Sequence, residues 1–127
     1  MPNVLNMKIV NSWDGTASTA LTRYRAVTLN YETKAVGYPA AQGDLVDGIV
    51  VVNAASGEQV QVVTDGIVPA VIKTISGLAK GDLLMAATDG GLLEATSTEV
   101  AIAQLLTVPA ANGDIALVRV IRPTIIP

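Results

Sequence analysis

Each of the seven aspartates in this 127-residue chain lies next to a glycine, and the pairs recur along the sequence. Glycine adopts positive φ without steric cost, and aspartate hydrogen-bonds its own backbone two residues on, so each pair predicts a tight turn. The pairs are Asp14-Gly15, Gly43-Asp44, Asp47-Gly48, Asp65-Gly66, Gly81-Asp82, Asp89-Gly90 and Gly113-Asp114. A chain that turns this often has room only for short elements.

The runs between these turns are typical of β-strands. The chain has 17 Val and 10 Ile but no Phe, and β-branched residues favour strands. No convincing 3.6-residue period appears, although residues 74–80 could form one helical turn. The expected strands are 4–10, 24–31, 49–52, 60–64, 67–75, 83–87, 92–95, 100–108 and 115–121. The sequence therefore predicts one all-β domain, a compact β-barrel or β-sandwich.

The first 38 residues differ from the rest in composition. They contain all four aromatic residues and carry a net charge of +2, whereas residues 39–127 carry −5. Residues 11–22 are small, polar and without period, which predicts a loop or an extended arm. Two interpretations stay open here: a long loop between two strands of an ordinary sheet, or an arm that orders only against a partner. We divide the chain into an N-terminal arm, residues 1–22, and a β-rich domain, residues 23–127.

The aromatic and basic residues of this first part are the candidates for protein contacts, because Trp, Tyr and Arg are enriched at interfaces. At the other end, Ile125 and Ile126 form an apolar tail that either folds back onto the core or is buried in a neighbouring subunit. The interface candidates are Trp13, Arg23, Tyr24, Arg25, Tyr31, Tyr38, Ile125 and Ile126.

Several function classes are disfavoured. The chain has no His and no Cys, which excludes Ser-His-Asp and Cys-His catalysis and imidazole or thiolate zinc sites. The aspartates already have a role in turns, so we expect no enzyme activity, cofactor or metal. A net charge of −3 argues against nucleic-acid binding. No secretory signal and no membrane span are expected, because the sequence has no basic start followed by an apolar run and no long apolar stretch.

The second half of the sequence resembles the capsid decoration, or cement, proteins of tailed phages over roughly residues 35–125. The resemblance rests on the order and spacing of turn motifs, each of which alone is weakly specific. They are Gly48-Ile49-Val50, Ala55-Ser56-Gly57-Glu58, Lys80-Gly81-Asp82-Leu83-Leu84, Asp89-Gly90-Gly91, Ala101-Ile102-Ala103 and Gly113-Asp114-Ile115. Residues 1–34 match no pattern of this kind.

The resemblance implies a β-tulip-like domain similar to the lambda head decoration protein. It further implies a homotrimer on the outer surface of a phage head that binds the major capsid protein, partly through an N-terminal arm, and stabilises the contacts between capsid subunits. The chain would then be made in the host cytoplasm and act in the virion, with no nucleic-acid or membrane partner. Two alternatives stay open: another phage structural β-module, such as a tail or fibre component, and a small carbohydrate-binding or other ligand-binding β-domain.

Overall fold

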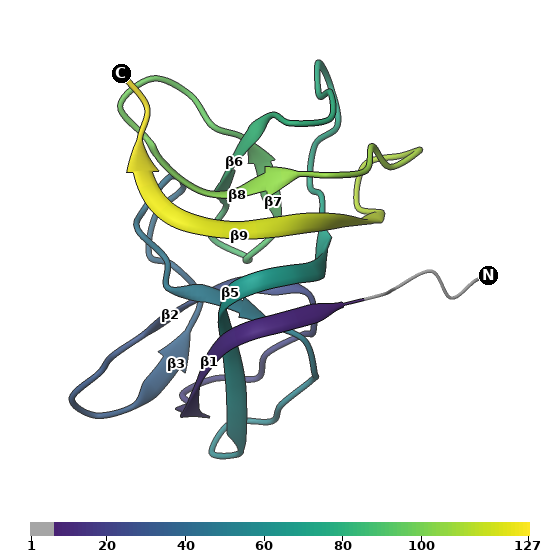
Figure 1. The fold of residues 1–127 in the computed structure, drawn as a ribbon. Helices are drawn as coiled ribbons and strands as arrows, with labels where there is room; N and C mark the ends of the chain where they lie inside the picture. Colours follow the sequence, from purple (N-terminus) through teal and green to yellow (C-terminus); the bar gives the residue numbers. More distant parts are fainter. Residues whose placement is uncertain (1–6) are drawn as a thin grey trace.

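A computed structural model describes residues 7–127, and every regular element in that range is a β-strand (Figure 1). These residues include no helix that could cross a membrane. The predicted all-β class is therefore confirmed. The strands are β1 (Lys8–Ala17), β2 (Arg25–Leu29), β3 (Ala35–Gly37), β4 (Gly48–Val50), β5 (Gln59–Val71), β6 (Leu83–Ala86), β7 (Leu92–Glu94), β8 (Val100–Leu105) and β9 (Ile115–Ile125).

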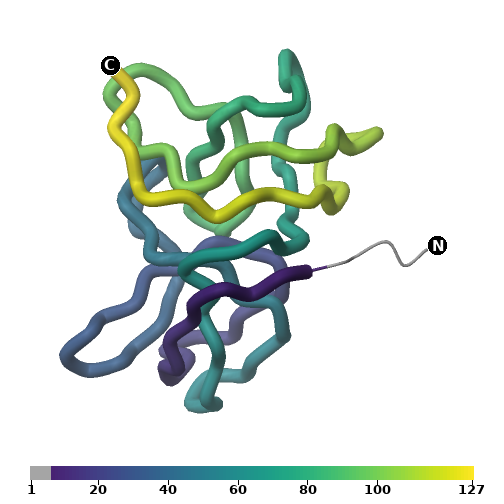
Figure 2. The backbone as a smooth tube through the Cα atoms, viewed as in Figure 1, coloured from purple at the N-terminus to yellow at the C-terminus, as the bar shows by residue number. Residues whose placement is uncertain are grey.

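The nine strands form two rings that share β5. Their order in the sheet is β1-β3-β2-β4-β5-β9-β8-β6-β7, and an additional β1–β5 pairing closes the first five strands on themselves. A parallel bridge between Ile72, just after β5, and Leu92 of β7 brings the ends of the second set together. The two halves lie one above the other in Figure 2, with the long strand β5 passing between them.

Each ring encloses its own apolar core. Neighbouring residues of β5 point into different cores, so Val62 belongs to one core and Val63 to the other. Both faces of such a strand are buried, which explains why apolar residues follow one another without polar alternation. The first core is formed by Ala17, Leu21, Val27, Leu29, Val36, Val50, Ala54, Val60 and Val62. The second is larger and includes Ile49, Val68, Ile72, Leu84, Leu92, Ile102, Leu105 and Val118.

The structure differs from the sequence-based expectations in three places. The turn predicted at Asp65-Gly66 does not reverse the chain, because Gly66 has a φ of +141° and β5 continues through it. Strand β3 was not predicted from its three residues, which gain their partners only from β1 and β2. The helical turn considered for residues 74–80 is instead a pair of hydrogen-bonded turns, closed by Leu78 and Asp82.

The N-terminal loop prediction is wrong over residues 11–17, which belong to β1. This strand pairs with β5 from Lys8 to Thr16 and with β3 at Thr16 and Ala17. Period-2 alternation is missing from its sequence because its first seven residues are exposed on both faces. Residues 1–6 of the predicted arm and the start of the predicted strand 4–10 lie outside the described range. Division of the chain at residue 22 stays a prediction.

Candidate interaction surface

The turn between β2 and β3 presents Tyr31 to solvent. The Asn30 side-chain oxygen accepts hydrogen bonds from the N–H groups of Glu32 and Thr33, at 2.9 and 3.0 Å, and Lys34 closes the turn with a φ of 65°. Side-chain acceptors of this kind stabilise turns without cross-strand partners. Tyr31 is consequently held at the tip of a defined turn, with 51% of its surface exposed.

Trp13 of β1 packs against this turn. Its ring lies edge-to-face with Tyr31, with centroids 5.2 Å apart and planes at 87°, and Lys34 Nζ lies 5.7 Å from its centroid. Both arrangements are favourable for aromatic rings, which attract a positive edge or a cation to their faces. Trp13 nevertheless remains 47% exposed. We call Trp13, Tyr31 and Lys34 the aromatic cluster.

Burial raises the pKa of the Tyr31 phenol above its ordinary value, and the negative charge of Asp47 and a hydrogen bond to that carboxylate raise it further. The phenol is therefore neutral at physiological pH and keeps a donor hydrogen. Asp47 also accepts a hydrogen bond from the Leu29 N–H at 2.7 Å. The Asp47 carboxylate is thus fixed at the end of β2, close to the phenol.

Two depressions lie along β1. An open polar groove of about 310 Å³ borders the aromatic cluster and is lined by Asp14, Gly15, Thr16, Lys34, Gly57 and Gln59. At the other end of β1 a smaller depression of about 150 Å³ is lined by Lys8, Val10, Asp65, Gly66, Ile67 and Arg119. We call the smaller one the Gly66 notch. Among residues 7–127, no three acidic side chains converge as metal ligands would.

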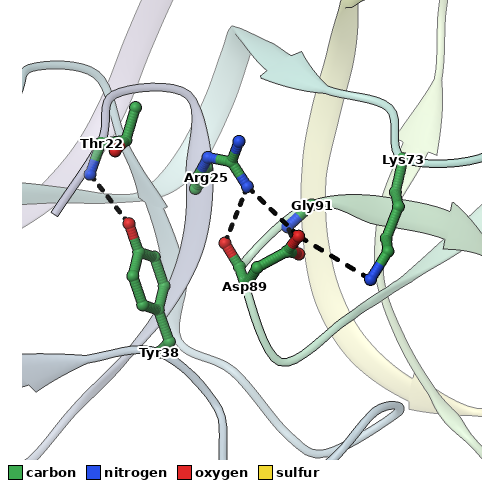
Figure 3. A network of polar contacts seen from close by, with 6 residues as sticks. All are labelled: Thr22, Arg25, Tyr38, Lys73, Asp89 and Gly91. Atoms are coloured by element: carbon green, nitrogen blue, oxygen red, sulfur yellow. Dashed lines mark hydrogen bonds and ion pairs between the residues drawn. The ribbon is translucent and has the colours of Figure 1, made fainter. Parts of the chain in front are cut away.

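The Arg25 side chain, one of the predicted contact residues, makes contacts within the chain. Its guanidinium donates to the Asp89 carbonyl oxygen at 3.0 Å and lies 3.6 Å from the Asp89 carboxylate, which also faces Lys73 Nζ at 3.7 Å (Figure 3). The Ala26 N–H donates to the Gly90 carbonyl oxygen next to it. These contacts attach β2 to the turn before β7 and thus join the two rings.

Desolvation raises the pKa of Asp89, but the Gly91 N–H and the charges of Lys73 and Arg25 outweigh it, so the pKa lies below its ordinary value of 3.8. A carboxyl whose pKa is lowered on folding stabilises the fold above its unfolded pKa, and this contribution is lost as pH falls through the folded value. Asp89→Asn keeps the acceptor for Gly91 and removes the charge.

We therefore expect Asp89→Asn to lower the melting temperature at neutral pH, by an amount equivalent to about 1 kcal/mol at most, because exposed ion pairs are screened. The difference from the wild type should disappear well below pH 3.8. Thermal unfolding followed by circular dichroism across this range measures both. A difference that persists unchanged in acid would show that charge pairing does not stabilise this junction. Asp114→Asn is the matched control, because no ion pair is found for Asp114 in the described part of the chain.

Three other predicted contact residues, Tyr24, Arg23 and Tyr38, pack or form a hydrogen bond within the chain. Tyr24 is 8% exposed and belongs to the larger core, so it is a core residue and offers no free contact surface. The Arg23 guanidinium lies over its ring at 5.1 Å. The Tyr38 hydroxyl accepts a hydrogen bond from the Thr22 N–H at 2.8 Å (Figure 3), which fixes the segment before β2. Of the aromatic residues, the structure brings together only Trp13 and Tyr31.

The C-terminal isoleucines do not enter either core. Ile125 ends β9 opposite Val100 and is 69% exposed, while Ile126 is half-buried and is held by backbone hydrogen bonds to Thr98 and Glu99. Of the two interpretations of this tail, folding back onto the core is wrong for Ile125. Burial of Ile125 in a neighbouring subunit stays a prediction.

Lys34 and Asp47 also belong to this surface and were not among the predicted residues. The polar run from Asn30 to Lys34 between two β-rich runs is the signal that could have indicated a hairpin turn beside Tyr31. Asp47 was assigned to a turn, and no local pattern indicates that it also reaches Tyr31 and Leu29.

No protein-family model matches this chain, and no curated protein matches it. Among solved structures, its fold is similar to that of the N base of head fiber gp8.5 in bacteriophage phi29, with a TM-score of 0.66. The two sequences are 16% identical, and the match covers 91% of this chain and 94% of the phi29 chain. These comparisons do not confirm the predicted lambda-like decoration family. At this identity the likeness establishes a shared fold over nearly the whole of both chains.

Proposed function

We propose that this chain is a structural component of a tailed-phage head that binds the outer surface of the capsid. The observation that carries the proposal is the extent of the fold likeness to a head fiber base, which covers 91% of this chain. The turn motifs that resemble capsid decoration proteins point, independently of that likeness, to the same location in a virion.

The aromatic cluster is the part of the surface that we assign to the capsid contact. Interface hot spots are enriched in Trp and Tyr, and rings already fixed by neighbours lose little conformational entropy on binding. Trp13 and Tyr31 are both half exposed and fixed against each other. The cluster lies within the part of the chain with net charge +2, so the more acidic remainder would face solvent.

We further propose that the chain forms a homotrimer and acts as a decoration protein. A homotrimer that grips several capsid subunits at once would convert modest single contacts into high avidity. Its partners would be the major capsid protein and further copies of itself. We propose no catalytic role and no cofactor for it.

A second candidate is favoured by the phi29 likeness itself: a base that attaches a fibre to the head. Such a protein would bind the capsid without joining neighbouring capsid subunits. The two roles therefore differ in one measurable property, the mechanical or thermal stability of the head with the protein bound.

The test uses particles of the phage that encodes the chain, with and without its gene. Electron microscopy should locate the chain on the outside of the head in the first set only. Decoration predicts that heads lacking the protein rupture at lower temperature and regain stability when purified protein is added. Restored binding without restored stability would indicate the fibre-base role. Density on the tail, or none on the virion, would overturn the head assignment.

A further inference from the structure

The Gly66 notch has the dimensions and lining of a receptor for one aliphatic side chain. Its volume is about 150 Å³, the size of a protein cavity that accepts a benzene molecule. Val10 and Ile67 form its apolar walls, and Gly66 lies between them and contributes no side chain to the lining.

The backbone geometry of β1 creates this space. The pairing register of β1 and β5 shifts between Ile9 and Asn11, so Val10 is an extra residue in a β-bulge. A bulge bends its strand and redirects the side chain. Val10 is 57% exposed. The notch is thus a built feature of the strand pairing.

The rim of the notch has an excess of positive charge. Lys8 and Arg119 stand against a single carboxylate, Asp65. One nitrogen of the Arg119 guanidinium contacts Gln104 at 3.3 Å, and the group has further donors to offer. An occupant that matches this site presents an aliphatic side chain next to a carboxylate.

One segment of the same chain has this chemistry. Among residues 7–127 the five most exposed aliphatic residues are Ile125, Val10, Leu45, Val108 and Val52, and of these five only Leu45 has an acidic neighbour in the sequence. Leu45 is 56% exposed and is preceded by the exposed Asp44. Ile115 also follows an aspartate, but it is 40% exposed and lies within the sheet opposite Val71.

Leu45 projects from a turn that is fixed on both sides. The Gly43 N–H donates to the Ala86 carbonyl oxygen at 2.9 Å, and the Asp44 carboxylate accepts from the Ala41 N–H at 3.0 Å. Val46, the next residue, is buried with 1% exposed. The exposed leucine is therefore preorganised, which reduces the entropy lost on binding.

We propose that copies of this chain associate head to tail, with Leu45 of one copy in the Gly66 notch of the next and Asp44 facing Lys8 and Arg119. The two surfaces differ, so the contact is heterologous and forms a ring when the rotation between copies closes. The use of this contact rests on the proposed function, in which a closed trimer binds the head. The contact itself is a property of the purified chain.

Disulfide trapping tests the contact directly, because the chain has no cysteine of its own. Val10→Cys and Leu45→Cys variants, mixed and treated with oxidised glutathione, should form a covalent pair containing one copy of each. Val108→Cys replaces Val10→Cys in the control mixture, since Val108 is similarly exposed at 52% but lies outside the notch. Equal yields in the two mixtures, or no cross-link in either, would overturn the proposal.

Sedimentation of unmodified variants supplies the second readout. Leu45→Ala should weaken self-association about tenfold or more while leaving thermal unfolding unchanged, because an interface anchor is lost and no core contact is. Lys8→Glu should also weaken association, because it reverses a charge that Asp44 of the next copy would face. A wild-type chain that stays monomeric at every soluble concentration, or a Lys8→Glu variant that associates as the wild type does, would contradict the contact.

Head binding separates this inference from the proposed function. If cross-linking and sedimentation show no notch contact but wild-type protein is found on heads, only the inference is overturned. Self-association through Leu45 with no head binding overturns the proposed function alone.

Discussion

Replacing Gly66 with alanine is expected to lower the free energy of unfolding by about 3 kcal/mol or more. Gly66 lies where β5 passes between β1 and β9, paired with Ile9 on one side and Val120 on the other. A Cβ atom at this position would stand 2.2 Å from the Lys8 carbonyl oxygen, and the φ of +141° is one that side chains rarely adopt. Because the added Cβ would collide with a backbone atom, β1 would have to move away from β5 to accommodate it.

Gly57→Ala is the matched control for this change. Gly57 also has a positive φ, +90°, but apart from Gly57 itself and its two neighbours in the chain no heavy atom of the described residues lies within 4 Å of the position that a Cβ would occupy. We expect it to cost about 1 kcal/mol, the conformational term alone. Urea denaturation followed by Trp13 fluorescence and circular dichroism measures both variants. Similar losses at the two positions would contradict the collision with β1 as the reason for glycine at 66.

Trp13→Ala is expected to weaken binding to phage heads by about 2 kcal/mol, roughly thirtyfold, because it removes the largest exposed ring of the aromatic cluster. Trp13 lies outside both cores, so the fold should lose only about 1 kcal/mol through the missing Tyr31 contact. The measurement is occupancy of heads at limiting protein concentration, with thermal unfolding of the free protein alongside.

Two further variants make the result specific. Trp13→Phe keeps an aromatic ring and should recover part of the affinity. Val52→Ala changes a side chain that is 49% exposed and lies outside the aromatic cluster, and it should bind as the wild type does. Unchanged occupancy for Trp13→Ala would remove the aromatic cluster from the capsid contact.

The candidate surface was only partly readable from sequence. Trp13 and Tyr31 were both predicted, because aromatic residues confined to a polar N-terminal part indicate contacts. The same pattern also selected Tyr24, which the structure buries at 8% exposure, and Tyr38, whose hydroxyl is engaged by Thr22. Composition cannot distinguish these four, since each ring's exposure depends on strands far away in the chain.

Strand β1 illustrates the same limit. Its seven exposed residues contain no alternation of apolar and polar side chains, so its sequence resembles a loop. It is a strand because β5, about fifty residues later, supplies hydrogen-bond partners from Gln59 to Ile67. Backbone pairing of this kind leaves no trace in side-chain periodicity.

Local backbone preferences of glycine, aspartate and β-branched residues made the all-β class, the positions of most turns and the separation of aromatic from aliphatic segments predictable from the sequence. Tertiary structure alone decided that β5 continues through Gly66 and serves two rings, that Tyr31 is exposed while Tyr24 is buried, and that Val10 and Ile67 border a notch. Each of these depends on which distant strands meet, and pairing between distant strands is a property of the whole chain.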